Sequence, residues 1–169
     1  MQATSSAAAP PTSPASCEIS CDPARLDVAM IHRFLSTETD WARGIPMSLL
    51  SRAIAHSLCF GAYDLEAVAG DAPQVGFARV ITDRATFAYL CDVFVVPEAR
   101  GRGIGRQLVV AVMAHPALHG LRRFMLATDT AAGLYERYGF TPLPADHPLM
   151  QIYRPDAYRH PAETAPQQR

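Results

Sequence analysis

Residues 93–109, Val-Phe-Val-Val-Pro-Glu-Ala-Arg-Gly-Arg-Gly-Ile-Gly-Arg-Gln-Leu-Val, place a basic, glycine-rich turn between two regular elements. The apolar, β-branched run before Pro97 predicts a strand. Apolar residues at helical spacing over 104–112 predict an amphipathic helix, which Pro116 ends. Glycines let a backbone approach an anion closely, and the free N–H groups at a helix start favour negative charge. The stretch therefore predicts a phosphate-binding loop.

Three arginines, Arg100, Arg102 and Arg106, add positive charge to this loop. Two other nucleotide-binding patterns fit it poorly. A P-loop needs GxxxxGK followed by Ser or Thr, and no lysine is present here. A dinucleotide fingerprint needs GxGxxG at the start of a βαβ unit, whereas these glycines are spaced GxGxG and follow a series of predicted strands.

The composition is that of one ordinary globular domain. The chain has 169 residues, of which 49% are hydrophobic and 18% charged, enough to bury a core. A formal net charge of −1 gives no overall field that attracts nucleic acid or an anionic membrane. No signal-peptide pattern opens the chain, and no apolar window is long enough to span a bilayer. We therefore expect a cytoplasmic protein that binds neither nucleic acid nor a membrane.

The four cysteines, Cys17, Cys21, Cys59 and Cys91, lack paired CxxC spacing and are too sparse for a disulfide scaffold. The sequence therefore predicts reduced thiols. The histidines are not grouped with carboxylates or cysteines as metal ligands are, so we expect no bound metal.

Composition also predicts the domain boundaries. Residues 1–16 are almost all small, polar or Pro, and such a segment cannot bury enough apolar surface to offset its ordering entropy. This segment is predicted to be a disordered tail. Residues 155–169 are polar and contain Pro, which predicts a loose C-terminal tail. The working domain is then 17–154.

Within that domain, periodicity and turn signals predict two helices followed by three strands that form an antiparallel meander. Asp22 and Pro23 mark the start of the first helix, and Pro46 marks the start of the second. The predicted elements are helix 23–36, a helix from 46, strands 58–63, 75–82 and 86–96, the helix after the glycine loop, strand 124–127, helix 132–138, and closing strands 140–142 and 150–153.

Two motifs now carry a resemblance to a known family. Arg100-x-x-Gly103-x-Gly105 is similar to the Q/R-x-x-G-x-G/A pyrophosphate signature of the GNAT (GCN5-related) acetyltransferases. The segment 134–140, Leu-Tyr-Glu-Arg-Tyr-Gly-Phe, resembles the family's LYEKxGF segment. The resemblance covers about 20–153. It implies an α/β (α+β) fold with a mixed, mostly antiparallel sheet flanked by helices, in which the strands at 86–96 and 124–127 splay apart.

The resemblance implies that acetyl-CoA is the co-substrate. The backbone of Val93 and Val95 is expected to bind its pantetheine arm in the gap between the splayed strands. Many relatives have an Asn that contacts the cofactor arm where this chain has Thr128. Either the Thr128 hydroxyl replaces that contact or the loop differs. The remaining expected cofactor contacts are the loop and the first helical turn: Arg100, Gly101, Arg102, Gly103, Ile104, Gly105 and Arg106.

By the same resemblance, Tyr135 is the general acid that protonates the leaving thiolate, although it could instead only pack its helix against the sheet. Asp92 either relays a proton or binds a cationic substrate, or it bonds nearby backbone or loop N–H groups. Glu38 and Trp41 lie in the loop where relatives often contact the acceptor. They could hold an amine by charge and cation–π attraction, or could be ordinary surface residues.

The resulting hypothesis is an N-acetyltransferase that moves the acetyl group of acetyl-CoA to a primary amine of a small molecule, peptide or protein. The alternative is a GNAT-like module that binds CoA as a sensor or partner domain with little turnover. A nucleic-acid patch made by the loop arginines fits the near-neutral net charge poorly. Many relatives form homodimers, although no heptad or interface stripe marks one here.

Overall fold

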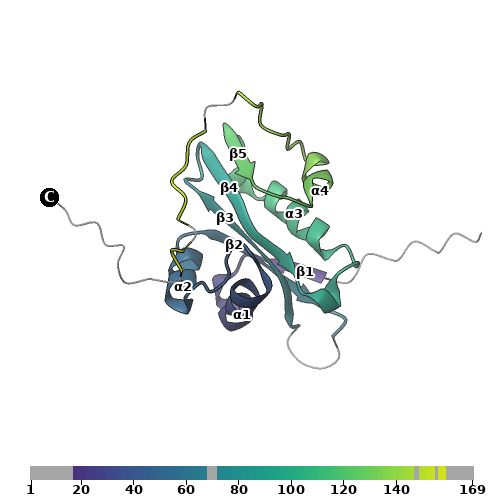
Figure 1. Cartoon of the computed structure of the whole chain (residues 1–169). Coiled ribbons are helices and arrows are strands. Elements are labelled where there is room, and N and C mark those ends of the chain that lie inside the picture. The colour runs from purple at the N-terminus through teal and green to yellow at the C-terminus, as the bar shows by residue number, and fades with distance from the viewer. Residues whose placement is uncertain (1–16, 68–71, 147–148, 155, 159–169) are drawn as a thin grey trace, which may run out of the picture.

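A five-stranded sheet with helices on both faces forms the centre of the fold (Figure 1). The computed structural model describes residues 17–67, 72–146, 149–154 and 156–158. Three short 3₁₀ turns, Pro23–Arg25, Pro97–Ala99 and Pro116–Leu118, join the larger elements. Those elements are β1 (Cys17–Ser20), α1 (Val28–Glu38), α2 (Met47–Ala55), β2 (Leu58–Asp64), β3 (Gln74–Thr82), β4 (Phe87–Val95), α3 (Ile104–Ala114), β5 (Arg123–Leu126) and α4 (Ala132–Glu136).

The strands lie in sequence order, β1-β2-β3-β4-β5. The first four are antiparallel neighbours, whereas β5 runs parallel to β4 because the connection between them passes through α3. The predicted mixed sheet and the antiparallel meander are confirmed. Strand β1 was not predicted from the sequence; it has only four residues and takes its register from β2.

The helices divide between the two faces of the sheet, with α1 and α2 on one face and α3 and α4 on the other (Figure 1). Each pair covers its own apolar core. The core under α1 and α2 includes Ile31, Leu35, Leu50, Phe77 and Phe94. The core under α3 includes Phe60, Ala62, Val80, Leu108 and Val112.

Gly76 of β3 lets α3 pack closely on the sheet. A Cβ atom added at Gly76 lies 3.1 Å from the carbonyl oxygen of Phe94, 3.2 Å from Cβ of Ala62 and 3.3 Å from Cδ1 of Leu108. These contacts are tighter than ordinary van der Waals distances, so a side chain here pushes α3 away from the strands. The position of α3 matters because its N-terminus carries the glycine loop.

The first helix begins later than the sequence predicts. Asp22 does accept a hydrogen bond from the amide of Ala24, at 2.9 Å, but it caps only a 3₁₀ turn. The chain then extends at Leu26, and Asp27 caps α1 by accepting from the amide of Met30 at 2.9 Å. Two Asp caps five residues apart give the same local signal, and the packing of α1 on the sheet selects the second. The predicted start of α2 after Pro46 is confirmed.

The two closing strands predicted at 140–142 and 150–153 are absent from the described residues, which have no regular structure there. Pro142 and Pro144 lack the N–H groups that a ladder needs. Met150 is 98% exposed and Ile152 is 86% exposed, so these apolar side chains have no sheet to cover. The apolar residues of this segment were therefore wrongly predicted to be strands.

The predicted tail at 1–16 lies outside the described residues, as do Pro155 and 159–169. Tyr158 lies beyond the predicted boundary at 154 and packs against the core under α1 and α2. No helix in the described ranges combines the length and the apolar character that crossing a membrane requires.

We expect Leu108→Ala to lower the free energy of unfolding by about 2–5 kcal/mol, because it leaves a cavity in a fully buried position. Val110→Ala is the matched control on the same helix, since Val110 is 46% exposed, and should change stability by about 0.5 kcal/mol or less. Urea unfolding followed by circular dichroism measures both. Equal losses for the two variants contradict this assignment of the core face of α3.

Candidate functional site

The strands β4 and β5 separate partway along their length. They pair in parallel register from Phe87 to Leu90 on β4, and β5 ends at Leu126 opposite Leu90. The remaining residues of β4, 91–95, have no partner on the β5 side among the described residues. The expected splay is therefore present, and it leaves one edge of β4 open to hydrogen-bond an extended ligand.

A β-bulge distorts β4 where it leaves β5. The register with β3 shifts between Phe77 and Arg79, so β4 carries an extra residue there. Asp92 lies in this bulge with a φ angle of 53°, a left-handed conformation that is uncommon outside glycine. Bulges of this kind re-aim side chains and interrupt pairing, often next to active sites.

An ion pair under α2 holds the bulge. The Nε atom of Arg79 lies 2.7 Å from Oδ2 of Asp92, and Nη1 of Arg79 donates to the hydroxyl of Ser57 at 3.1 Å. Side-chain exposures of 14% for Arg79 and 9% for Asp92 make this a buried pair, which is costly to break. The observed partner of Asp92 is thus a guanidinium, not the backbone N–H groups considered from the sequence. A direct role for Asp92 in proton relay or substrate binding stays a prediction.

The glycine loop presents a run of unpaired amides after β4. Gly101 and Gly103 have φ angles of 75° and 80°, and nothing lies within 4 Å of a Cβ atom added at either. The amides of 101–106 have no backbone acceptor in the described part of the chain, and no side chain caps α3. Six consecutive free donors at a helix N-terminus suit a phosphate. The backbone of Gly101, Gly103, Ile104 and Gly105 therefore forms the candidate anion site.

The three loop arginines have different roles. Arg102 is bound by Asp64 at the end of β2, with Nη1–Oδ2 and Nη2–Oδ1 distances of 2.6 and 2.9 Å, and its Nη2 atom also lies 2.9 Å from Oε2 of Glu66. Its side chain therefore anchors the loop to β2. Arg100 donates from Nε to the carbonyl oxygen of Val95 at 3.0 Å, which ties it back to β4. Arg106 is exposed and forms no ion pair among the described residues.

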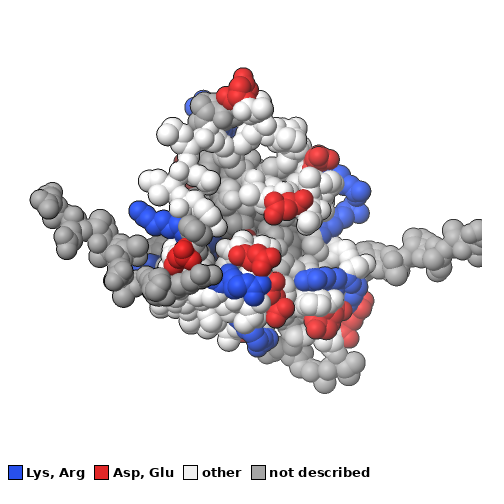
Figure 2. Space-filling view, in the orientation of Figure 1, with Lys and Arg blue, Asp and Glu red and all other residues white. Residues whose placement is uncertain are grey.

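The charged side chains do not gather into one basic surface on the face shown in Figure 2, where both signs are interspersed. This distribution gives that face no continuous track for a nucleic-acid backbone.

Tyr135 of α4 is only 8% exposed, yet its hydroxyl has no hydrogen bond to any described residue. Its ring packs edge-to-face on Phe140, with centroids 6.0 Å apart. Burial raises the pKa of the Tyr135 hydroxyl above its ordinary value, so this group is a neutral donor at physiological pH. A cavity of about 290 Å³ lies beside it, between β5, α4 and the segment after Phe140.

Thr128 also lines this cavity. Its Oγ1 atom accepts a hydrogen bond from the amide of Ala131 at 3.0 Å, so it shapes the turn that leads into α4. The hydroxyl hydrogen stays available to donate, and a cofactor contact from Thr128 stays a prediction.

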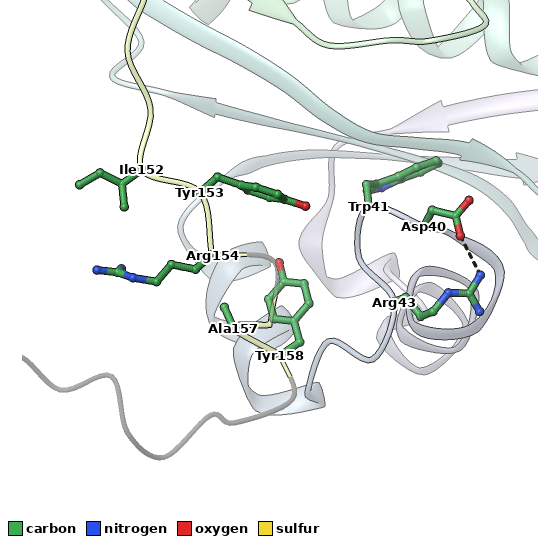
Figure 3. Close-up of a pocket in the computed structure, with 8 residues that line it drawn as sticks. All are labelled: Asp40, Trp41, Arg43, Ile152, Tyr153, Arg154, Ala157 and Tyr158. Atoms are coloured by element: carbon green, nitrogen blue, oxygen red, sulfur yellow. Dashed lines mark hydrogen bonds and ion pairs between the residues drawn. The ribbon is translucent and has the colours of Figure 1, made fainter.

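A second pocket, of about 460 Å³, opens on the α1–α2 face (Figure 3). Trp41 lines it, as do Asp40 and Arg43 of the same loop, whereas Glu38 does not. Oε1 of Glu38 instead lies 3.1 Å from the hydroxyl of Thr37. The opposite wall comes from the C-terminal segment, with Ile152, Tyr153, Arg154, Ala157 and Tyr158. Sequence reasoning missed this wall, because Tyr158 lies in the predicted tail and Tyr153 in a predicted strand.

All four cysteines are free thiols. Burial raises the pKa of Cys59 to about 11 and that of Cys91 to about 12, so both are protonated and poorly nucleophilic at neutral pH. The described residues include no group of three potential metal ligands.

Comparison with known proteins identifies close relatives. A family model described as an acetyltransferase (GNAT) domain matches residues 55–142. A crystal structure from Xanthomonas campestris pv. campestris, assigned to the GNAT family, is 57% identical with a TM-score of 0.77, over 84% of this chain and 96% of that one. An acetyltransferase-family protein of Gibberella zeae is 38% identical over 133 residues, 69% of this chain and 74% of that protein. A Mycobacterium tuberculosis protein in complex with CoA shares the fold at 20% identity, with a TM-score of 0.59 over 75% of this chain and 73% of that one.

We expect Asp64→Asn to destabilise the fold at neutral pH, because it breaks the bidentate pair with Arg102. The hydrogen bond from Arg102 holds the pKa of Asp64 below its ordinary value. The pair therefore stabilises the fold above that ordinary value, and its contribution is lost as the pH falls through the depressed one. Urea unfolding of the wild-type protein and the variant at several pH values measures their free energies of unfolding. The difference between the two should shrink under acid conditions. A difference that is absent at neutral pH, or that grows in acid, overturns this sign.

Proposed function

This chain belongs to the GNAT acetyltransferase family and is an acyltransferase, and on that premise we propose that it transfers the acetyl group of acetyl-CoA to a primary amine of a small molecule, peptide or protein. One observation carries the proposal: six unpaired amides at the start of α3 lie directly after the strand whose edge is open. The loop and the edge match the two parts of CoA, an anionic pyrophosphate and an extended amide-containing arm.

We assign the pyrophosphate to the amides of 101–106, with the unpaired cation of Arg106 beside them. The pantetheine arm is proposed to bond backbone groups of Val93 and Val95 along the open edge of β4. The carbonyl oxygen of Val95 already accepts a hydrogen bond from Arg100. Arg100 is therefore proposed both to hold the end of β4 in place and to contact the phosphate directly. The CoA bound to the Mycobacterium tuberculosis protein of the same fold supports CoA as the ligand.

In the proposed reaction, a neutral amine nitrogen attacks the thioester carbonyl carbon; the C–N bond forms and the C–S bond breaks. The amine gives up one proton and the leaving sulfur gains one. Tyr135 is the proposed donor to the sulfur and regains its proton from solvent. Its burial and raised pKa support this role, because they keep the hydroxyl protonated. A backbone N–H of β4 is proposed to stabilise the developing oxyanion.

We propose that Asp92 receives the amine's proton or binds the incoming ammonium. Arg79 bonds Oδ2, which leaves Oδ1 without a hydrogen bond among the described residues. The bulge supports this role, since it turns Asp92 out of the regular strand at the point where the edge of β4 becomes open. Trp41 is proposed to contact the acceptor. Glu38, the last residue of α1, does not line the pocket and is proposed to contribute only its negative charge.

The test combines calorimetry of acetyl-CoA binding with release of free CoA thiol across a panel of primary amines. Binding together with amine-dependent thiol release is the expected result. The key variant is Gly103→Val, whose side chain fills the space that the pyrophosphate requires, so acetyl-CoA affinity should fall at least tenfold. Binding without release from any amine favours the CoA-binding module instead, and no binding at all refutes both functions.

Gly120→Val is the matched control for Gly103→Val. Gly120 has a φ angle of 71° and equally open surroundings, so valine costs a similar backbone strain of about 1–2 kcal/mol at either position. Both variants should therefore lose similar stability, while only the first loses acetyl-CoA binding. Equal affinities for the two variants contradict the pyrophosphate assignment.

We expect Tyr135→Phe to retain acetyl-CoA affinity and lower kcat by about 100-fold, the usual effect of removing a general acid. Because burial raises the pKa of Tyr135, any loss of rate caused by its ionisation should begin above the ordinary tyrosine value of 10 and vanish in the variant. Tyr138→Phe on the same segment is the control. Stopped-flow thiol release over a range of pH gives both results, and an unchanged kcat removes Tyr135 as the acid.

A further inference from the structure

We propose that the 460 Å³ pocket between the α1–α2 loop and the C-terminal segment binds acceptors in which a short alkyl chain links the primary amine to an aromatic ring. This inference rests on the proposed N-acetyltransferase function and narrows its substrate class. Three aromatic side chains carry it, Trp41 from the loop and Tyr153 and Tyr158 from the C-terminal segment (Figure 3).

Two of the three aromatic side chains, Trp41 and Tyr153, are largely exposed at the pocket. Trp41 is 60% exposed and Tyr153 is 74% exposed, and Figure 3 shows the ring of Tyr153 directed toward Trp41 across the pocket. Neither ring is stacked on another ring among the described residues. Large flat faces left open on opposite walls of a cavity suit a flat apolar ligand group, which stacks on them and removes their surface from water.

The charges of the pocket disfavour acceptors with several positive charges. Its lining residues include two cations, Arg43 and Arg154, and one anion, Asp40, so they carry an excess of one positive charge. Asp40 is already 2.9 Å from Arg43. A polyamine needs several carboxylates in reach, and this lining offers one that is shared. Binding energy must therefore come mainly from the aromatic surfaces.

Tyr158 connects the pocket to the sheet. It lines the pocket and is half-buried against the core under α1 and α2, which includes Phe94 of β4. Phe94 lies two residues along that strand from Asp92. Burial raises the pKa of the Tyr158 hydroxyl, and Asp92 and Arg79 lie close enough to shift that pKa as well. An amine joined by a short chain to a ring held between Trp41 and Tyr153 is proposed to reach toward Asp92.

The test uses Trp41, the single tryptophan of the chain, as a fluorescent reporter within the pocket. Titration with 2-phenylethylamine is compared with 2-cyclohexylethylamine, which has the same carbon skeleton with a puckered, saturated ring in place of the flat aromatic one, and with spermidine. We expect saturable changes in Trp41 emission and an affinity for phenylethylamine about tenfold higher than for either of the others. Equal affinity for the saturated ring, or tighter binding of spermidine, overturns the proposal.

Variants in the C-terminal segment test whether the amine binds in this pocket. Tyr153→Ala should weaken phenylethylamine binding about tenfold and raise its KM with little change in kcat, whereas Tyr153→Phe keeps the ring and the affinity. Met150→Ala is the control, since Met150 is 98% exposed on the same segment and does not line the pocket. Both readouts use the full chain, and Tyr153 lies outside both buried cores, so these variants should fold normally. An unchanged Tyr153→Ala variant contradicts the assignment.

The binding and turnover results separate this inference from the proposed function. Thiol release with aliphatic amines and no preference for aromatic ones leaves the acetyltransferase in place and refutes the aromatic pocket. Ring-selective binding at Trp41 with no thiol release from any amine supports the pocket and refutes the transferase.

Discussion

The short pairing of β4 with β5 is the constraint on which the site depends. The two strands share only the register from Phe87 to Leu90, because β5 has just four residues. Beyond that point the backbone N–H and C=O groups on this edge of β4 have no neighbouring strand to pair with. Such groups inside a protein require some other hydrogen-bond partner. The gap in the sheet is therefore itself the proposed binding surface for the cofactor arm.

The bulge at Asp92 and the glycine loop both follow from the course of β4 past this gap. The buried pair with Arg79 offsets the cost of the left-handed backbone at Asp92. Farther along, Gly76 lets α3 lie close to the sheet, which brings the free amides of the loop to the end of the same strand. One strand thus connects the proposed anion site, the open edge and the buried carboxylate.

The arginines show how tertiary structure divides one residue type among several roles. Arg79 pairs with a buried carboxylate of the neighbouring strand, and Arg102 is held by two carboxylates at the turn after β2. Arg106 alone among the three loop arginines has neither a hydrogen bond nor an ion pair from its side chain to a described residue, and it lies in the first turn of α3. The sequence counts three equivalent cations in the loop, and only the positions of the acidic partners distinguish them.

Local signals determined much of this protein. The glycine spacing, the helical periodicity after it and the alternating strands before it depend on neighbouring residues, so they predicted the β2–β3–β4 meander, the loop and α3 from the sequence alone. The motif around Tyr135 was equally readable. The tertiary structure alone decided where α1 begins, that the segment after Phe140 does not join the sheet, and that Tyr153 and Tyr158 line one pocket with Trp41. These features depend on contacts between residues far apart in the chain, whose partners no local pattern specifies.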